Sequence, residues 1–229
     1  MYITFRFTPL KILTLALFLC SPAYASLITI TTSADAFVNS GDPDRNFGSE
    51  TILRVGRSDT ADLSTSITPA ASPGTRIAYL SFDLSNLTTD LFLSDFSLSI
   101  FQGDTQREPG GFNVFAQDSI FDENSITFNN RPDVDEFLFR TGTLRTGLNT
   151  FNNTALLNYA QEVIRGERQS FGLVFTLFDS VGGDTLSSGA SSNIAFAPTV
   201  TANIPEPSGI FLLALFALST IFVRKYQLK

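Results

Sequence analysis

The chain has 229 residues, and its 22 acidic residues outnumber its 15 basic residues, which gives a net charge of −7. It has no histidine and a single cysteine, Cys20, so catalysis by Ser-His or Cys-His pairs and zinc sites built from Cys and His are excluded. The acidic balance also excludes nucleic acid as a partner, because its phosphates would be repelled.

The first 25 residues predict a secretory signal peptide. The positive start consists of Arg6 and Lys11, and the apolar stretch is residues 12–19. The cleavage site of small residues is Ala23-Tyr24-Ala25. We expect cleavage between Ala25 and Ser26, which predicts an exported protein. Cleavage there also removes Cys20, so the mature chain must obtain its stability from its core rather than from disulfides.

Residues 26–203 form one predicted domain that is long enough to bury a substantial core. Ten arginines against 21 acidic residues give this domain a net charge of −11. Such a charge favours divalent cations and neutral or cation-bridged polymers as partners, although solubility alone would also explain it.

Short stretches with a period of two follow one another along the domain, as expected for strands with one buried face. In residues 76–84 one face is apolar, and the other carries Tyr79, which we therefore expect to be exposed. In residues 96–100 three apolar side chains alternate with Ser97 and Ser99. Further strands are expected at residues 27–32, 36–39, 52–55, 112–116, 126–128, 137–141, 171–178 and 199–202.

One helix is predicted among these strands, at about residues 154–165. Its start is capped by Asn153 or Thr154, and Gly166 ends it. Its apolar face consists of Leu156, Tyr159, Ala160 and Val163. Many short strands with turn signals between them and one short helix predict an all-β domain, namely a β-sandwich of the jelly-roll type.

The end of the chain, residues 204–229, predicts a membrane anchor. Its parts are Pro205-Glu206-Pro207, an uncharged run at residues 209–223, and the cations Arg224 and Lys225. The run is about 22 Å long as a helix, slightly short for a bilayer, and flanking cations can make up the difference by snorkelling. We expect a transmembrane helix at residues 209–223 with these cations on the cytoplasmic side; a buried core helix is the alternative.

The same tail resembles the PEP-CTERM sorting signal of Gram-negative bacteria, in which a Pro-Glu-Pro motif, a short apolar span and a basic end occur in this order. The resemblance implies an exosortase as partner and export to the cell surface. It also implies a bacterium that makes extracellular polysaccharide. Whether the tail is cut or retained stays open.

The domain resembles the DNRLRE-type modules, which are disaggregatase-related jelly rolls with carbohydrate-binding members. The matching stretches, which span about residues 28–202, are Asp35-Ala36-Phe37-Val38, Asn46-Phe47-Gly48-Ser49, Leu53-Arg54-Val55-Gly56, Phe82-Asp83-Leu84 and Ile126-Thr127-Phe128-Asn129-Asn130-Arg131-Pro132. Phe121 and Phe128 stand where tryptophan is usual. The resemblance implies a jelly roll and a carbohydrate ligand.

A structural calcium ion is the expected cofactor, because hard cations bind carboxylate and amide oxygens. The candidate ligands are Asp42, Asp44 and Asn46, which have the alternate spacing of a calcium loop, and Asp35 and Asp83 at positions that match the family. The loop is not an EF-hand, since Phe47 and Leu53 stand where its Gly and Glu are required. The same spacing would also suit a simple turn before a strand.

For sugar binding, Tyr79 is the candidate stacking platform, and three arginines, Arg54, Arg76 and Arg131, are candidates to pair with acidic sugars. Internal salt bridges are the alternative role for these arginines. Paired carboxylates in the polar turns, at residues 122–123 and 133–136, are more typical of a solvated surface than of a glycosidase. We therefore predict that the protein is not an enzyme.

Two functions follow from these observations. The first is a non-catalytic module at the cell surface that binds the cell's own extracellular polysaccharide. The second is a structural protein of the envelope or matrix that has no glycan ligand. Retardation in native gels that contain polysaccharide distinguishes them, because only the first predicts it.

Overall fold

The computed structural model describes residues 26–58, 73–88, 91–103, 111–177, 182–187 and 194–205. The predicted signal peptide and its Ala23 and Ala25, together with Glu206, Pro207, the span at 209–223, Arg224 and Lys225, lie outside the described residues. Within the described residues no helix is long and apolar enough to cross a membrane.

The described domain is built almost entirely from strands, and it is the unit Leu27–Asn203 that is considered below. The elements in chain order are β1 (Ser26–Asn39), β2 (Ile52–Ser58), β3 (Gly74–Phe82), β4 (Asp95–Gln102), β5 (Phe112–Gln117), β6 (Phe137–Arg140), β7 (Gly147–Asn152), α2 (Thr154–Ile164), β8 (Phe171–Leu177), β9 (Gly182–Ser187), the 3-10 turn η1 (Ile194–Phe196) and β10 (Thr199–Ile204).

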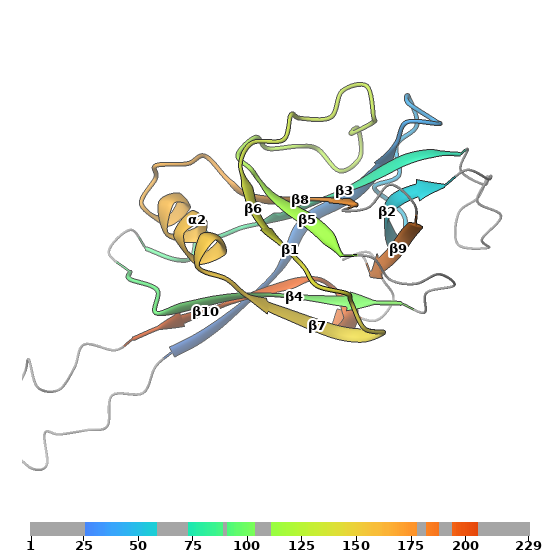
Figure 1. Ribbon diagram of the computed structural model, residues 1–229. Coiled ribbons are helices and arrows are strands. Elements are labelled where there is room, and N and C mark those ends of the chain that lie inside the picture. The colour runs from blue at the N-terminus through green and yellow to red at the C-terminus, as the bar shows by residue number, and fades with distance from the viewer. Residues whose placement is uncertain are drawn as a thin grey trace, which may run out of the picture. The chain divides into compact units, whose positions relative to one another are not determined.

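The strands form one curled antiparallel sheet in the order β1-β10-β4-β9-β2-β3-β8-β5-β6, with β7 paired to β4. The sheet curls back on itself because β1 also pairs with β3, and an irregularity between Thr32 and Ala34 lets this strand serve both layers. Figure 1 shows one layer with β4, β7 and β10 and another with β3, β5 and β8. The predicted all-β, sandwich-like domain with one short helix is confirmed at this level.

The core lies between the two layers. Phe96, Leu98 and Ile100 of β4 are fully buried, as their alternation with serine predicts. Across the core, the Phe171 ring of β8 packs edge-on to Phe96 with ring centroids 5.3 Å apart. Aromatic side chains therefore join the two layers.

The helix α2 is where the sequence predicts it. The side chain of Asn153 caps its start by accepting a hydrogen bond from the Ala155 N–H at 2.8 Å, and Gly166 follows its end with a positive φ. Tyr159 is buried, as expected, and its ring stacks on Phe171 at 4.8 Å. The helix thus closes one end of the core.

The strand expected at residues 126–128 is not formed; this stretch is irregular and turn structure. The reason is local, because the Asn130 Oδ1 accepts hydrogen bonds from both the N–H and the hydroxyl of Thr127. Side chains of this kind compete with the sheet for backbone groups. Conversely, β7 and β9 are strands that the sequence patterns do not predict.

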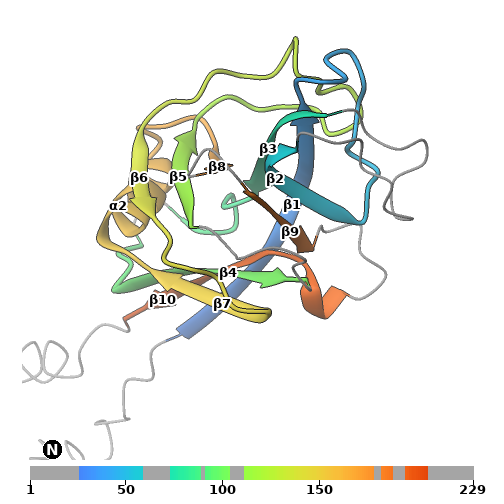
Figure 2. The same ribbon diagram turned by 45° about the vertical axis from the view of Figure 1, so that its right-hand side comes forward.

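The segment 118–136 instead folds over the outer face of the layer that contains β3. Ile126 from this segment joins a buried cluster with Ala36, Val38, Tyr79 and Val174 from the strands, and four partly buried side chains complete the cluster: Ile77, Phe115, Phe121 and Phe128. We call this set the outer cluster and the segment 118–136 the cover. The layer with β3 therefore has apolar contacts on both of its faces. Figure 2 shows the backbone of the cover as the long connection between β5 and β6.

Candidate functional site

The predicted stacking platform, Tyr79, is not at the surface. Its side chain is 0% exposed within the outer cluster, and its hydroxyl donates a hydrogen bond to the Pro132 carbonyl at 3.3 Å. Burial raises the pKa of this hydroxyl to about 12. The expectation of an exposed Tyr79 is wrong, because the cover occupies the side of β3 that the alternation assigns to solvent.

Two of the predicted sugar-binding arginines are also inside the protein. Arg54 and Arg76 are each 8% exposed, and each is engaged in an interaction within the domain. Gly56 of β2 pairs with Arg76 of β3, so these two arginines lie on the same face of the sheet. Their burial agrees with the alternative of an internal role rather than with a surface that pairs with acidic sugars.

Arg131 is the one predicted sugar-binding residue that is partly exposed. Its guanidinium lies 3.7 Å from the centre of the Phe128 ring, and its Nη1 donates to the Phe128 carbonyl. It also lies close enough to Tyr79 for its charge to lower the pKa of that hydroxyl, although burial outweighs this effect. Both contacts join residues of the cover itself, so Arg131 stabilises the fold of this segment.

The predicted calcium loop holds the cover in place. Asn46 donates two hydrogen bonds from its amide, to the carbonyls of Glu123 at 2.7 Å and Ile126 at 2.8 Å, while its oxygen accepts from the Gly48 N–H. A Cβ on Gly48 would overlap the Glu123 carbonyl oxygen, so only glycine fits there. We call this contact between the loop at 42–48 and the cover the latch.

The two aspartates of this loop have different hydrogen-bond partners. Asp44 accepts from the Asn129 side chain at 2.7 Å, and Asp42 accepts from the Asn39 side chain at 3.3 Å. Hydrogen bonds from the Ser85 side chain and from the Ser85 N–H lower the pKa of Asp83. In the described part of the chain no group of three or more His, Cys, Asp or Glu residues is placed to hold a metal ion. Calcium binding therefore stays a prediction.

A carboxylate that sequence reasoning did not single out as a ligand, Glu123, meets the buried candidate Asp35. The Glu123 carboxylate accepts the Asp35 N–H at 3.2 Å, and Asp35 is 2% exposed. Burial raises the pKa of Glu123; the Asp35 N–H opposes this shift, and the charges of Asp35 and Asp122 add to it. The signal for this pair is weak in the sequence, since Glu123 stands among turn acids that are ordinarily solvated.

The other turn acids have structural roles. Asp122 accepts hydrogen bonds from the Asn124 N–H and the Ser125 hydroxyl, and Asp135 accepts from the Asp118 N–H at 2.7 Å. Glu136 forms an ion pair with Arg168 at 2.9 Å. Each of these three carboxylates therefore stabilises a turn or an ion pair.

The outer face of β5 and β6 beyond the cover presents an exposed aromatic ring beside polar side chains. Phe137 is 50% exposed, and its ring packs edge-on to Phe115 with centroids 5.5 Å apart. Two residues away along β5 and three along β6, the Arg140 Nε donates to the Asn113 Oδ1 at 3.2 Å. Because Phe115 pairs with Phe137 and Asn113 pairs with Arg140, these four side chains share one face; we call them the aromatic shelf.

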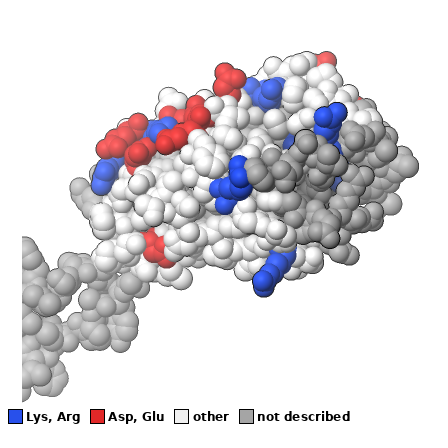
Figure 3. Space-filling view, viewed as in Figure 1, with Lys and Arg blue, Asp and Glu red and all other residues white. Residues whose placement is uncertain are grey.

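The charges around the aromatic shelf are mixed. Arg168 bridges Glu136 and Glu162 at 2.9 Å each, and Figure 3 shows acidic side chains gathered over the α2 side of this face. Arg140 is a cation on the shelf itself. The half-exposed Phe137 ring lies about 7 Å along the strands from a guanidinium and an amide. This arrangement suits a sugar ring and its polar substituents.

Sequence reasoning missed this shelf, although both of its strands are predicted. Residues 112–116 and 137–141 were expected as strands, but the register that brings Phe115 opposite Phe137 depends on an irregularity between Val114 and Phe115. Such an irregularity changes which side chains share a face and leaves no clear pattern in the sequence.

The fold is that of a β-sandwich-like module, and the shelf presents a half-exposed ring beside polar side chains. The comparison with protein families matches residues 26–193 to carbohydrate-binding module family 96, which is most of the chain. The chain belongs to this family. No curated protein matches it.

Proposed function

We propose that this protein is an exported, non-catalytic module that binds extracellular polysaccharide at the aromatic shelf. The family match over residues 26–193 carries the proposal, since it gives carbohydrate as the class of partner. A binding module needs no catalytic pair, in keeping with the structural roles of the turn acids.

At the shelf, the exposed side of the Phe137 ring would stack on the apolar face of a sugar. Arg140, held by Asn113, would donate hydrogen bonds to hydroxyl or carboxylate oxygens of the same or the next sugar. Phe115 supports the Phe137 ring from behind. A sugar polymer that carries carboxylates would use both groups.

Affinity electrophoresis of the purified protein in gels that contain acidic or neutral polysaccharide tests this proposal. We expect retardation, and we expect Phe137→Ala to lower the affinity about tenfold, as for an exposed stacking contact. Phe92→Ala is the matched control, because Phe92 is 65% exposed and lies outside the shelf. Retardation that Phe137→Ala leaves unchanged would remove the shelf as the site. The absence of retardation with every glycan would favour the structural, ligand-free protein instead.

We further propose that the tail directs the protein to the surface of a Gram-negative bacterium through an exosortase and the membrane. The support is the order of Pro205-Glu206-Pro207, the span at 209–223 and the cations Arg224 and Lys225 in the sequence. Replacement of the Pro-Glu-Pro motif by alanines should leave the protein in the membrane fraction unprocessed. Unchanged release to the surface in that variant would contradict the assignment.

Calcium remains part of the proposal as a structural ion, on the oxygen-bearing side chains of the loop at 42–48 and at Asp35. A ligand that binds the folded state and not the unfolded state raises the melting temperature by mass action. We therefore expect the melting temperature of the chelated protein to rise in millimolar calcium and not in millimolar magnesium. A flat calcium titration would remove the ion from the proposal.

A further inference from the structure

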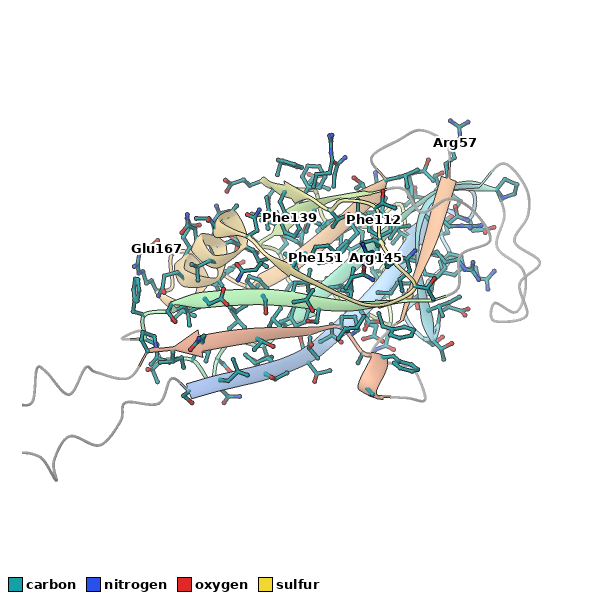
Figure 4. The ribbon with its side chains drawn as sticks, turned by 60° about the horizontal axis from the view of Figure 1, so that its bottom comes forward. Arg57, Phe112, Phe139, Arg145, Phe151 and Glu167 are labelled. Atoms are coloured by element: carbon teal, nitrogen blue, oxygen red, sulfur yellow. The ribbon has the colours of Figure 1, made fainter. Side chains whose placement is uncertain are left out.

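The opposite layer has an outer face of a different chemistry. On β4, β7 and β10 most inward positions are apolar, with Gln102 and Asn149 as the exceptions, and most outward positions carry hydroxyl or amide groups. The pairing places these outward side chains in rows across the three strands: Thr150, Ser99 and Thr199 in one row, and Asn152, Ser97 and Thr201 in the next. We call this surface the hydroxyl face; the strands that form it lie toward the viewer in Figure 4.

The rows form a regular array. Neighbouring strands are about 4.8 Å apart, and alternate residues along a strand are about 6.8 Å apart. The Ser99 and Thr150 hydroxyls lie 2.9 Å apart and bond to each other, which fixes their orientation. The Ser99–Thr150 pair therefore offers a pre-ordered donor and acceptor on an open sheet, with little side-chain entropy to lose on binding.

The hydroxyl face is almost uncharged although the domain has a net charge of −11. Of the described outward side chains on β4, β7 and β10, only Asp95 is charged, and its carboxylate accepts a hydrogen bond from Asn152 at 2.6 Å. Such a face suits a neutral partner, since an ionic partner would find no opposite charge to pair with.

One end of the array carries aromatic rings. Phe101, on the outward side of β4, stacks on Phe196 of η1 with centroids 4.1 Å apart and planes 23° apart. Leu148, which is 65% exposed, lies opposite Phe101 on β7. The rows of hydroxyls therefore end beside a group of apolar side chains. Hydroxyl groups next to apolar side chains match the polar edges and apolar faces of a sugar polymer.

We propose that the hydroxyl face is a second glycan-binding surface, and that its ligand is a neutral polysaccharide lying along β4. It differs from the aromatic shelf in layer, in charge and in the groups that contact the ligand. One domain would then hold two polysaccharide chains at once, a neutral chain on one layer and a second chain on the other, and would cross-link them.

The test uses the purified protein in native gels with hydroxyethylcellulose or dextran as neutral probes and polygalacturonate as the acidic probe. The variant Thr150→Val/Thr199→Val/Thr201→Val removes three hydroxyls and keeps the β-branched shape, so the sheet is retained. We expect it to lower the affinity for a neutral probe at least about tenfold and to leave binding to the acidic probe unchanged. Thr143→Val is the control, since Thr143 is exposed between β6 and β7, outside the face.

Each outcome decides the proposal. Loss of neutral-glycan binding in the triple variant supports it, even if the shelf itself binds nothing. It is overturned if no neutral probe retards the protein, or if the triple variant is retarded as strongly as the unsubstituted protein. A concentration-dependent dimer in sedimentation that the triple variant abolishes would assign the face to self-association instead.

Discussion

The outer faces of the two layers differ: the face that contains β3 is covered by another segment, and the face that contains β4 is open. On β3, the outward side chains Ile77 and Tyr79 lie under the cover, and Tyr79 is fully buried. On β4, the outward Ser97 and Ser99 remain partly exposed in an open array. Alternation alone predicts which residues share a face of the sheet. The chemistry of the outward-facing residues predicts whether that face is covered or open.

The strongest test of this comparison is to substitute one outward-facing residue on each layer. Tyr79→Ala removes a buried ring and leaves a cavity, so we expect the free energy of unfolding to fall by about 3–5 kcal/mol. Ser97→Ala on the open layer should change it by less than about 0.5 kcal/mol. Urea denaturation of both variants measures the contrast. A loss of under about 1 kcal/mol for Tyr79→Ala would mean that the cover contributes little to stability.

The latch offers a second, smaller effect. Asn46→Ala removes both hydrogen bonds to the cover and leaves the carbonyls of Glu123 and Ile126 without this donor, so we expect a loss of about 1–3 kcal/mol. Hydrogen exchange should rise in residues 118–136 and stay unchanged in β4, because local opening follows local contacts. Asn124→Ala is the control, since Asn124 is exposed and bonds only within its own turn. Uniformly faster exchange in both layers would show that the latch does not act locally.

The smallest expected effect concerns the charge of Glu123. Its pKa is raised in the folded protein, so the folded state holds this proton more tightly than the unfolded state does. The unsubstituted protein should therefore lose stability as the pH rises from 4.5 through the raised pKa, and Glu123→Gln, which keeps an acceptor for the Asp35 N–H, should lack this loss.

Urea midpoints below pH 4.5 and at neutral pH, with a chelator present, measure this difference. Glu123→Gln should gain on the unsubstituted protein as the pH rises. Asp122→Asn is the control, because the hydrogen bonds of Ser125 and Asn124 lower the pKa of Asp122 and its contribution has the opposite sign. Parallel pH profiles for Glu123→Gln and the unsubstituted protein would mean that Glu123 is as well solvated in the folded state as in the unfolded state.

The elements that the sequence predicts best are those whose signals are local. The alternation of β4 and the cap of α2 are read from neighbouring residues, and both are confirmed. Tyr79 could not be placed, because the side chains that cover it belong to Phe121 and Ile126, which are distant in the chain. The apolar residues of the cover resemble strand residues in the sequence, but their side chains pack on the outer face of the sheet; these residues are Phe121, Ile126 and Phe128.

The candidate sites divide in the same way. The family resemblance pointed to carbohydrate, whereas the individual residues chosen for it, Tyr79, Arg54 and Arg76, are buried. Phe137 and the rows of the hydroxyl face depend on which strands become neighbours, and that pairing is set by contacts distant in the sequence. Fold class is therefore more accessible from this sequence than the surface that the fold presents.

The position of the last strand has a mechanical consequence. β10 lies between β1 and β4 rather than at an edge of the sheet, so it is held along both sides. If the chain beyond Pro205 is the tether, a pull on it loads two ladders of hydrogen bonds together instead of peeling away a single edge strand. Under such a load, a strand with two neighbours separates less easily than a strand at the edge of the sheet.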